Sequence, residues 1–264
     1  MSWSLATLAF LFMWRLYLAS SVLGYLLGSF PTGYLVGRAH GIDIREHGSK
    51  NMGATNVVRV LGKKPGYLVF ICDALKGLLA VRLAIWYVHH AGQTASEMIL
   101  RDGAKIDLAL DPKSHDGLQT LATIDARLAG VAVLAGIIAG LACILGHNFP
   151  VWLRFKGGKG VATTVGVLLG LMPGAVGVAA IVWIVTYFTT RYVSLASLLG
   201  AAVLPVAVWM LTLRQGLLAG PPWLFYFSLL AAALIFWRHR ANIGRLLNGT
   251  EARFARKPSP PPEP

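Results

Sequence analysis

The sequence predicts an all-α integral membrane protein with seven transmembrane helices. Hydrophobic residues make up 56% of its 264 residues and charged residues only 13%, about half of what a soluble domain carries. Several stretches reach the ~20 mostly apolar residues that a membrane span needs. A formal net charge of +13 on so little polar surface indicates contact with anionic head groups or anionic substrates. Nucleic acid is the weaker interpretation, because the sequence has no soluble basic domain to hold it.

Seven apolar runs are the predicted spans. They cover about Leu11–Val36, Gly66–Val88, Leu128–Leu145, Gly160–Leu171, Val176–Phe188, Leu198–Leu213 and Trp223–Trp237. Pro31 and Pro205 predict kinks inside two of them, and Pro173 separates the fourth run from the fifth. We expect residues 1–254 to form one transmembrane domain, with 92–125 as a polar extracytoplasmic loop and 255–264 as a disordered proline-rich tail.

Lysine and arginine are unevenly divided between the two sides of the predicted membrane. With seven spans, residues 38–65, residues 146–160, Arg191 and the tail share one side, which carries 16 of the 24 Lys and Arg residues. Six lie on the other side, and Lys76 and Arg82 lie within a span. The positive-inside rule makes the richer side cytoplasmic, with the N-terminus outside and the C-terminus inside. The glycine-rich basic loops therefore all fall on the cytoplasmic face, which predicts a single anionic site there.

One stretch organises this predicted site: residues 146–164, G-H-N-F-P-V-W-L-R-F-K-G-G-K-G-V-A-T-T. Its glycines permit close approach of main-chain N–H groups, and Arg154, Lys156 and Lys159 add three positive charges with no acid in the stretch. Such N–H groups at the start of a helix, with lysines beside them, form a cradle for an anion such as phosphate. The alternative is a loop that is basic only because of topology. The positive-inside rule explains the charge of the loop but not its glycines, so we favour phosphate binding.

A second polar segment, Arg38 to Pro65, alternates small polar side chains with basic ones. Residues 48–56 read G-S-K-N-M-G-A-T-N. Ser49 or Asn51 could simply cap a short interfacial helix, since Ser and Asn beside glycine are ordinary cap and turn residues. On the alternative interpretation they donate hydrogen bonds to a phosphate or a polyol. The repetition of small polar side chains beside basic ones favours the functional interpretation.

The second predicted span carries Asp73 and Lys76, three residues apart and therefore on one helix face, where they can pair. Charges inside a span are functional candidates by default. Two alternatives stay open: the pair neutralises itself near the start of the span, or Lys76 extends to the interface.

Three motifs together resemble the bacterial acyl-phosphate:glycerol-3-phosphate acyltransferase family. They are the G-S-K-N-M-G-A-T-N segment, the H-N-F-P-V-W-L-R-F-K-G-G-K-G-V-A-T stretch and the R-H-R-A-N-I-G-R-L-L-N-G-T-E segment from Arg238. The resemblance covers about Gly28 to Phe254. It departs at Lys50, where the family pattern has glycine, and in the long insert. It implies a seven-span inner-membrane enzyme that moves a fatty acyl group from acyl phosphate to the 1-hydroxyl of glycerol 3-phosphate, giving lysophosphatidate and phosphate.

The resemblance also implies the residues of the site, motif by motif. The implied catalytic residues are Ser49, Asn51, His147, Lys159, His239 and Asn242. The implied substrate-binding residues are Thr55, Asn56, Arg59, Lys156, Gly157, Gly158, Gly160, Thr163, Ser194, Ser197, Arg238 and Glu251, to which we add Lys76.

The chemistry suits these residues, because an acyl phosphate carries a good leaving group and needs no covalent nucleophile. Positioning two anions and stabilising charge would supply most of the rate. We expect direct attack by the glycerol hydroxyl, with a substrate phosphate oxygen taking the proton, since the core motifs show no buried carboxylate with a free histidine partner. His147 is the best protein candidate for a base, and a histidine that merely holds its loop is an equal alternative.

Other functions compete with acyl transfer. A transporter or flippase for a phosphorylated solute would also need a basic cradle and broken helices, but the chain has no internal repeat. A non-catalytic lipid-binding subunit is a third class. We expect no cofactor, no metal and no nucleotide, because zinc-type spacing is absent, the spaced aspartates of CDP-alcohol transferases are absent, and Lys159 is followed by Gly160 where a P-loop has Ser or Thr. The expected partners are the two substrates and membrane lipids, with the chain acting as a monomer.

Overall fold

Helices are the regular structure of this chain wherever it is described. A computed structural model describes residues 5–103, 115–214 and 223–253. The helices are α1 (Leu5–Ser29), α2 (Thr32–Ala39), α3 (Ala54–Leu61), α4 (Lys63–Gly103), α5 (His115–Asn148), α6 (Val161–Leu171), α7 (Pro173–Thr190), α8 (Val193–Arg214), α9 (Trp223–Arg238) and α10 (Arg240–Leu247), with 3-10 turns η1 (Ile44–Glu46) and η2 (Val151–Leu153). The all-α prediction is confirmed for these residues. Six of the seven predicted runs each lie on one helix, and the first is divided between α1 and α2.

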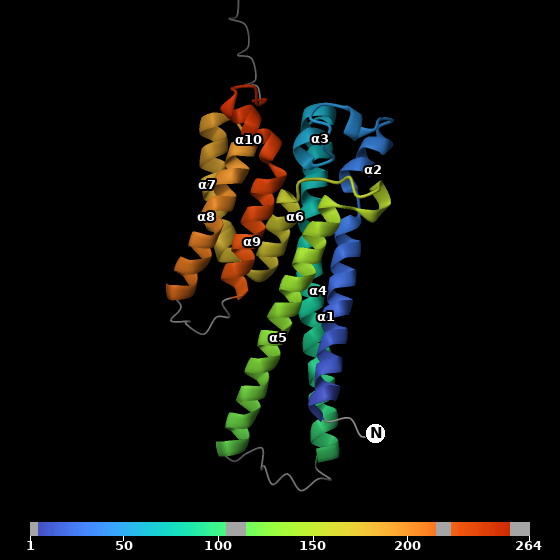
Figure 1. Cartoon of the computed structure of the whole chain (residues 1–264), viewed down its shortest axis with the longest axis vertical. Helices are drawn as coiled ribbons and strands as arrows, with labels where there is room; N and C mark the ends of the chain where they lie inside the picture. The colour runs from blue at the N-terminus through green and yellow to red at the C-terminus, as the bar shows by residue number, and fades with distance from the viewer. Residues whose placement is uncertain (1–4, 104–114, 215–222, 254–264) are drawn as a thin grey trace, which may run out of the picture. The chain divides into compact units, whose positions relative to one another are not determined.

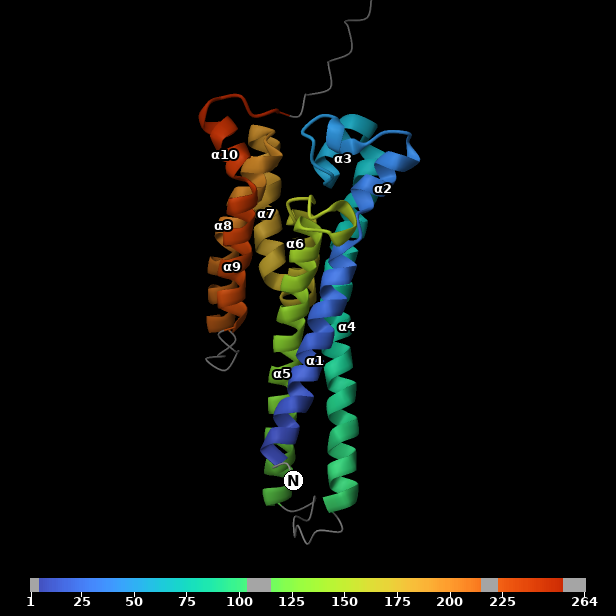
Figure 2. The same ribbon diagram turned by 45° about the vertical axis from the view of Figure 1, so that its right-hand side comes forward.

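The chain divides into two compact units, Met1–Leu171 and Met172–Pro264. In the N-terminal unit, the long helices α1, α4 and α5 pack against one another, and α6 packs on α4 and α5 (Figures 1 and 2). Small residues allow the close approach of α1 and α5, since a Cβ on Gly28 would collide with the Cys143 carbonyl. The single transmembrane domain predicted for residues 1–254 stays a prediction.

The first predicted span is not one helix. Leu11–Val36 was expected to be a continuous span kinked at Pro31, but α1 ends at Ser29 and α2 begins at Thr32. Proline donates no N–H and its ring clashes with the helical carbonyl four residues earlier, which either kinks a helix or ends it, and at Pro31 the helix ends. The break places α2 beside η1 and α3, which carry the first polar segment.

The insert 92–125 also differs from the predicted loop. α4 continues through Gly103 and α5 starts at His115, so most of the insert extends these two helices (Figure 1). Residues 104–114 lie outside the described residues, as do 215–222 and the predicted tail 255–264. Turn residues such as Asp116-Gly117 did not interrupt the helix, because a single glycine costs a helix only ~1 kcal/mol.

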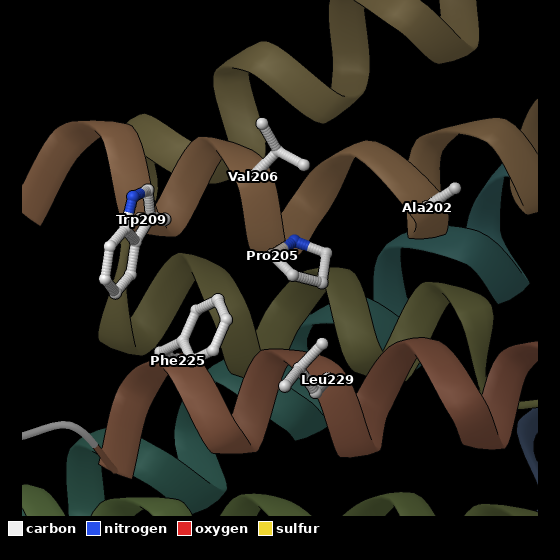
Figure 3. Close-up of a pocket in the computed structure, with 6 residues that line it drawn as sticks. All are labelled: Ala202, Pro205, Val206, Trp209, Phe225 and Leu229. Carbon is white, nitrogen blue, oxygen red and sulfur yellow. The ribbon is translucent and has the colours of Figure 1, made fainter.

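In the C-terminal unit, α8 packs between α7 and α9, and α10 contacts α8 and α9. Met172 occupies the N-cap position of α7 and Pro173 is its first residue, which confirms the predicted break. Pro205 lies inside α8. An apolar groove lies beside it, between α8 and α9, as Figure 3 shows; its lining residues are Ala202, Pro205, Val206, Trp209, Phe225 and Leu229.

Three helical segments among the described residues are long and apolar enough to cross a membrane: Leu128–Leu153, Pro173–Thr190 and Val193–Leu211. Two shorter apolar helices, Val161–Leu171 and Trp223–Arg238, accompany them. Large apolar side chains on these helices point outward, for example Ile181 (64% exposed) and Val206 (58%). Such an outer surface suits lipid and not water.

Candidate functional site

Asn56 organises the loop of the first polar segment. Its side chain is 1% exposed. Its Oδ1 accepts from the Ser49 N–H at 2.8 Å, and its Nδ2 donates to the carbonyls of Ile44 (3.2 Å) and His47 (3.0 Å). Asn56, predicted to bind substrate, therefore holds the backbone that carries Ser49. Ser49 itself is exposed at the tip of this loop.

The helix that follows this loop starts without a side-chain cap. α3 has Gly53 at its N-cap position, so neither Ser49 nor Asn51 is the cap. Asn51 instead accepts a hydrogen bond from the Gly53 N–H at 2.8 Å, two residues on, in the manner of an Asx turn. Thr55 is half-buried and Arg59 is exposed, both within α3.

Arg45 and Asp43 fix the start of the same loop. Asp43 Oδ2 lies 2.7 Å from Arg45 Nη2, and its Oδ1 also accepts from the Arg45 N–H at 3.0 Å. The Arg45 guanidinium lowers the pKa of Asp43 to about 2. The Arg45 guanidinium also stacks 4.6 Å from the ring centre of Tyr34 in α2. These contacts join the loop to α2.

The central stretch folds back onto the end of α5. The N–H groups of Gly157 and Gly158 donate to the carbonyls of Asn148 (3.2 Å) and His147 (3.0 Å). A Cβ on Gly158 would collide with Nε2 of His147. Glycine is therefore required at this position by the histidine ring, which is itself only 3% exposed.

Gly160 turns the chain into α6. Its φ of 79° lies in the left-handed region that glycine tolerates best. α6 starts at Val161, so its first N–H groups face the turn, and Thr163 is buried within the first turn of the helix. Lys156 is exposed and Lys159 is half-buried. Glycines, lysines and a helix N-terminus are thus adjacent. The Gly157 and Gly158 N–H groups, expected to point at the anion, donate to protein carbonyls instead, so an anion cradle here would draw on the lysines and the N-terminus of α6.

The two polar segments of the N-terminal unit meet. Leu153, from η2 in the central stretch, packs in one buried cluster with Ile44, Met52, Val57 and Val69. Figures 1 and 2 both place the 149–160 loop at the end of this unit that carries α2 and α3. The first and second motifs, separated by about ninety residues, are therefore brought together on one end of the unit.

Behind the central stretch lies a buried charged group. Lys76 Nζ is 2.9 Å from Asp73 Oδ1, and His147 Nδ1 is 3.7 Å from the same oxygen. Asp73 lies in α4, outside the three motifs, so this buried carboxylate beside His147 is one that the motifs alone did not predict. Lys76 Nζ also donates to the Phe30 carbonyl at 3.0 Å. Lys76, predicted to bind substrate, has these two internal partners and is 6% exposed.

The sequence predicts the Asp73–Lys76 pair, but Asp73 is not among the predicted site residues. The only signal available was a carboxylate inside an apolar run. Its distance to His147, 74 positions along the chain, depends on the packing of α4 on α5 and could not be read from spacing.

The C-terminal unit gathers the third motif around Glu251. Its Oε1 accepts from Asn242 Nδ2 at 2.6 Å, and its Oε2 lies 2.6 Å from Arg245 Nε. Burial alone would raise the pKa of Glu251, but Asn242, the nearby Ser194 hydroxyl and Arg245 together lower it. Ser194, at the start of α8, is 6% exposed. Asn242, Ser194 and Glu251, all predicted site residues, therefore lie together.

The remaining predicted residues of this unit have internal contacts. Ser197 accepts from Trp183 Nε1 at 3.3 Å, which joins α8 to α7. His239 is 4% exposed, and its Nδ1 lies 2.8 Å from the Ile235 carbonyl, so that nitrogen carries the proton. Arg238 is half-buried, with its guanidinium 5.7 Å from the ring centre of Trp237.

No group of three His, Cys, Asp or Glu side chains that could hold a metal ion occurs in the part of the chain that the structure describes. Most of the predicted site residues instead carry cations, amides or hydroxyls. Side chains of these kinds bind phosphate and hydroxyl groups.

A family model described as glycerol-3-phosphate acyltransferase matches residues 18–249. Relatives of the same name share 40% identity with this chain in Desulforamulus reducens (88% of this chain, 92% of the relative) and 42% in Acaryochloris marina (89% and 91%). A third, from Rhizobium meliloti, is 39% identical over 94% of this chain and 98% of its own length.

Two crystal structures of PlsY (YgiH), an integral membrane glycerol 3-phosphate acyltransferase, share the fold. The glycerol 3-phosphate form superposes with a TM-score of 0.68 at 33% identity, covering 90% of this chain and 96% of that one. The lysophosphatidic acid form gives a TM-score of 0.66 with 90% and 95% covered. Together with the apolar helices, this likeness makes the chain a multi-pass membrane protein. The match over nearly the whole length shows that the chain belongs to the glycerol-3-phosphate acyltransferase family.

Proposed function

We propose that this protein transfers a fatty acyl group from acyl phosphate to the 1-hydroxyl of glycerol 3-phosphate, releasing lysophosphatidate and inorganic phosphate. The observation that carries the proposal is the cradle at the start of α6, where Lys156 and Lys159 flank glycines folded onto His147. It lies in a chain of this family, and PlsY structures exist in glycerol 3-phosphate and lysophosphatidic acid forms. The reaction would be the first acylation of phospholipid synthesis.

Each unit holds a cluster of predicted site residues. The N-terminal unit would supply the cradle, with Ser49, Asn51, Thr55 and Arg59 presented by the loop that Asn56 holds. Gly157, Gly158, Gly160 and Thr163 would form the wall of the cradle. The C-terminal unit would supply Ser194, Ser197, Arg238, His239, Asn242 and Glu251. Lysine and arginine side chains beside both substrates would offset the repulsion between the two phosphates. They would also align the glycerol hydroxyl with the acyl carbonyl.

The chemical step needs no covalent enzyme intermediate. The glycerol oxygen bonds to the acyl carbonyl carbon, the bond from that carbon to the phosphate oxygen breaks, and the hydroxyl proton passes to a phosphate oxygen. His147 stays the protein candidate for a base in the alternative route, because Asp73 Oδ1 lies 3.7 Å from its Nδ1. Its Nε2 faces Gly158, in the glycine-rich stretch of the cradle.

We place the enzyme in the bacterial inner membrane, as a monomer with seven spans, the N-terminus outside and the site at the cytoplasmic face. Within each unit, the basic segments share one end. Arg38–Pro65 and residues 146–160 do so in the N-terminal unit, and in the C-terminal unit Arg253 stacks 4.7 Å from the ring centre of Tyr192. Such clustering is what the positive-inside rule requires of cytoplasmic loops.

The test is purified protein supplied with acyl phosphate and radiolabelled glycerol 3-phosphate. Labelled lysophosphatidate should form with acyl phosphate and not with acyl-CoA or acyl-carrier protein. Lys159→Ala should lower kcat/KM at least 10-fold, because a charge-assisted contact to phosphate is removed. A non-catalytic lipid-binding subunit would give no product with any donor. A transporter would move glycerol 3-phosphate into proteoliposomes without releasing phosphate from acyl phosphate.

A further inference from the structure

The Asp73–Lys76 pair in α4 is an unusual feature of a membrane helix. Both side chains are more than nine-tenths buried, at 3% and 7% exposure. Removing two charges from water is costly, and an ion pair inside a protein is often no more stabilising than a packed apolar pair. An internal pair of this kind therefore calls for a role other than stability.

Each member of the pair also contacts a different segment. Lys76 Nζ donates to the carbonyl of Phe30, which lies at the break between α1 and α2. Asp73 Oδ1 faces Nδ1 of His147 in the last turn of α5. The Lys76 carbonyl accepts from the Cys143 thiol at 3.6 Å, which fixes α4 against α5 at the same level. The pair thus joins α4 to α5 and to the break between α1 and α2.

Both contacts lead on to the candidate site. Nε2 of His147, on the far side of the ring from Asp73, packs against Gly158, and the His147 carbonyl accepts the Gly158 N–H at 3.0 Å. Beyond Phe30, Gly33 of α2 packs against the Met52 carbonyl, in the loop of the first polar segment. Asp73 therefore supports the glycine-rich stretch through His147, and Lys76 supports the loop that carries Ser49 through the Phe30 carbonyl.

We propose that Asp73 and Lys76 are positioning residues of the acyl transfer, which set the glycine-rich stretch through His147 and the Ser49 loop through the Phe30 carbonyl. Neither touches substrate. The Asp73 carboxylate, 3.7 Å from His147 Nδ1, attracts a proton on that nitrogen and so favours one orientation of the ring. The ring then has one orientation, and with it Gly157 and Gly158 have one position. This inference rests on the proposed function, but its structural part can be measured without activity.

The structural part is tested by hydrogen–deuterium exchange in the full-length protein in detergent. Asp73→Asn keeps the shape of the side chain and removes its charge, and it should speed exchange of peptides covering residues 155–160 at least 10-fold. Arg82→Met is the matched control, because Arg82 is an exposed cation of the same helix. Its exchange at 155–160 should equal that of the wild type. Unchanged exchange in Asp73→Asn would overturn the proposal.

Removing both charges distinguishes a variant that misfolds from one in which only the glycine-rich stretch is displaced. Asp73→Asn/Lys76→Met leaves no uncompensated charge inside, so its melting temperature should return to near that of the wild type. Its exchange at residues 155–160 should stay at least 10-fold faster. If stability and exchange both return to wild-type values, the pair is structural only and the proposal is wrong.

The catalytic part is tested by a double-mutant cycle read as kcat/KM for glycerol 3-phosphate. Asp73→Asn should cost at least 10-fold, as loss of outer-shell partners does in other sites. Combined with His147→Ala, it should cost no more than His147→Ala alone, because Asp73 acts through that ring. Additive losses would contradict this coupling. A wild-type protein without any product would instead refute the proposed function, while the exchange data would still decide the positioning claim.

Discussion

Lys50 adopts a left-handed backbone conformation, with φ at 58°, in the loop that carries Ser49. An L-residue with a Cβ pays roughly 1–2 kcal/mol for this conformation, and glycine avoids that cost at the expense of more freedom in the unfolded chain. The family pattern expected from the sequence has glycine here, and the structure gives the physical reason for it.

Lys50→Gly should therefore raise the free energy of unfolding by about 1 kcal/mol. Lys50→Ala is the control, since it removes the same long side chain but keeps the strained Cβ. Chemical denaturation of the two variants side by side checks the prediction. Equal stability of the glycine and alanine variants would show that the backbone strain is not relieved.

The second prediction for a single residue concerns Gly158. Its added methyl group would collide with the His147 ring, so Gly158→Ala must displace either the ring or the loop. We expect kcat/KM to fall at least ~100-fold, because small misplacements at a reacting centre cost that much.

Gly177→Ala is the matched control for Gly158→Ala, since nothing lies within 4 Å of the Cβ it would add in α7. Activity of that variant should match the wild type, and its stability should stay equal or rise slightly, because alanine suits a helix better than glycine. A Gly158→Ala enzyme with normal kcat/KM would show that the contact between loop and ring is dispensable.

At the scale of the elements, the segment after α10 folds back onto that helix and is held there by hydrogen bonds. The N–H groups of Thr250 and Glu251 donate to the Arg245 carbonyl at 2.8 Å and 3.1 Å, and the Glu251 carboxylate binds Asn242 and Arg245. The pKa of Glu251 is lowered from its ordinary 4.5 in the folded protein, so folding favours the charged carboxylate. Its stabilising contribution is full above that ordinary value and declines as the pH falls through the lower folded one.

Glu251→Gln should accordingly be less stable than the wild type at pH 7, and the difference should shrink as the pH falls below about 4.5. Melting temperatures of both proteins between pH 7 and pH 3.5 check this. In an Arg245→Met background the difference at pH 7 should already be smaller, because the ion pair is gone. A difference that grows on acidification would have the wrong sign for a carboxylate with a lowered pKa.

The elements that could be predicted are those that depend on local pattern. Apolar runs set where the helices lie, and Pro173 set the start of α7 as expected. The break at Pro31 and the helical insert were not predicted, because whether a proline kinks or ends a helix, and whether polar residues extend one, depends on neighbouring helices. Leu153 and Met52 meet only through such packing.

At the scale of the whole molecule, charge and resemblance predict a set of site residues. They do not predict which of these residues would bind substrate and which hold the surrounding backbone. Asn56 and Lys76 were expected to meet substrate, whereas each is buried against protein groups. Asn242 and Glu251 were expected in one site and do bond to each other. A pattern of residue types identifies polar segments, and only packing decides which members face a ligand and which hold the frame.

The prediction for the whole chain concerns its orientation in the membrane. A cysteine introduced at the exposed His47 should react with a membrane-impermeant maleimide only after the cells are permeabilised, because the positive-inside rule puts that loop in the cytoplasm. A cysteine at position 114, in the insert, should react in intact cells. Both experiments use a background with Cys72 and Cys143 replaced by alanine. The reverse labelling pattern would invert the proposed orientation.

The most direct test of the whole account is the formation of lysophosphatidate by the purified protein from acyl phosphate and glycerol 3-phosphate. Product should appear with one phosphate released per acyl group transferred, and with no added metal, nucleotide or thioester. Uptake of glycerol 3-phosphate into proteoliposomes without any acylated product would contradict the account.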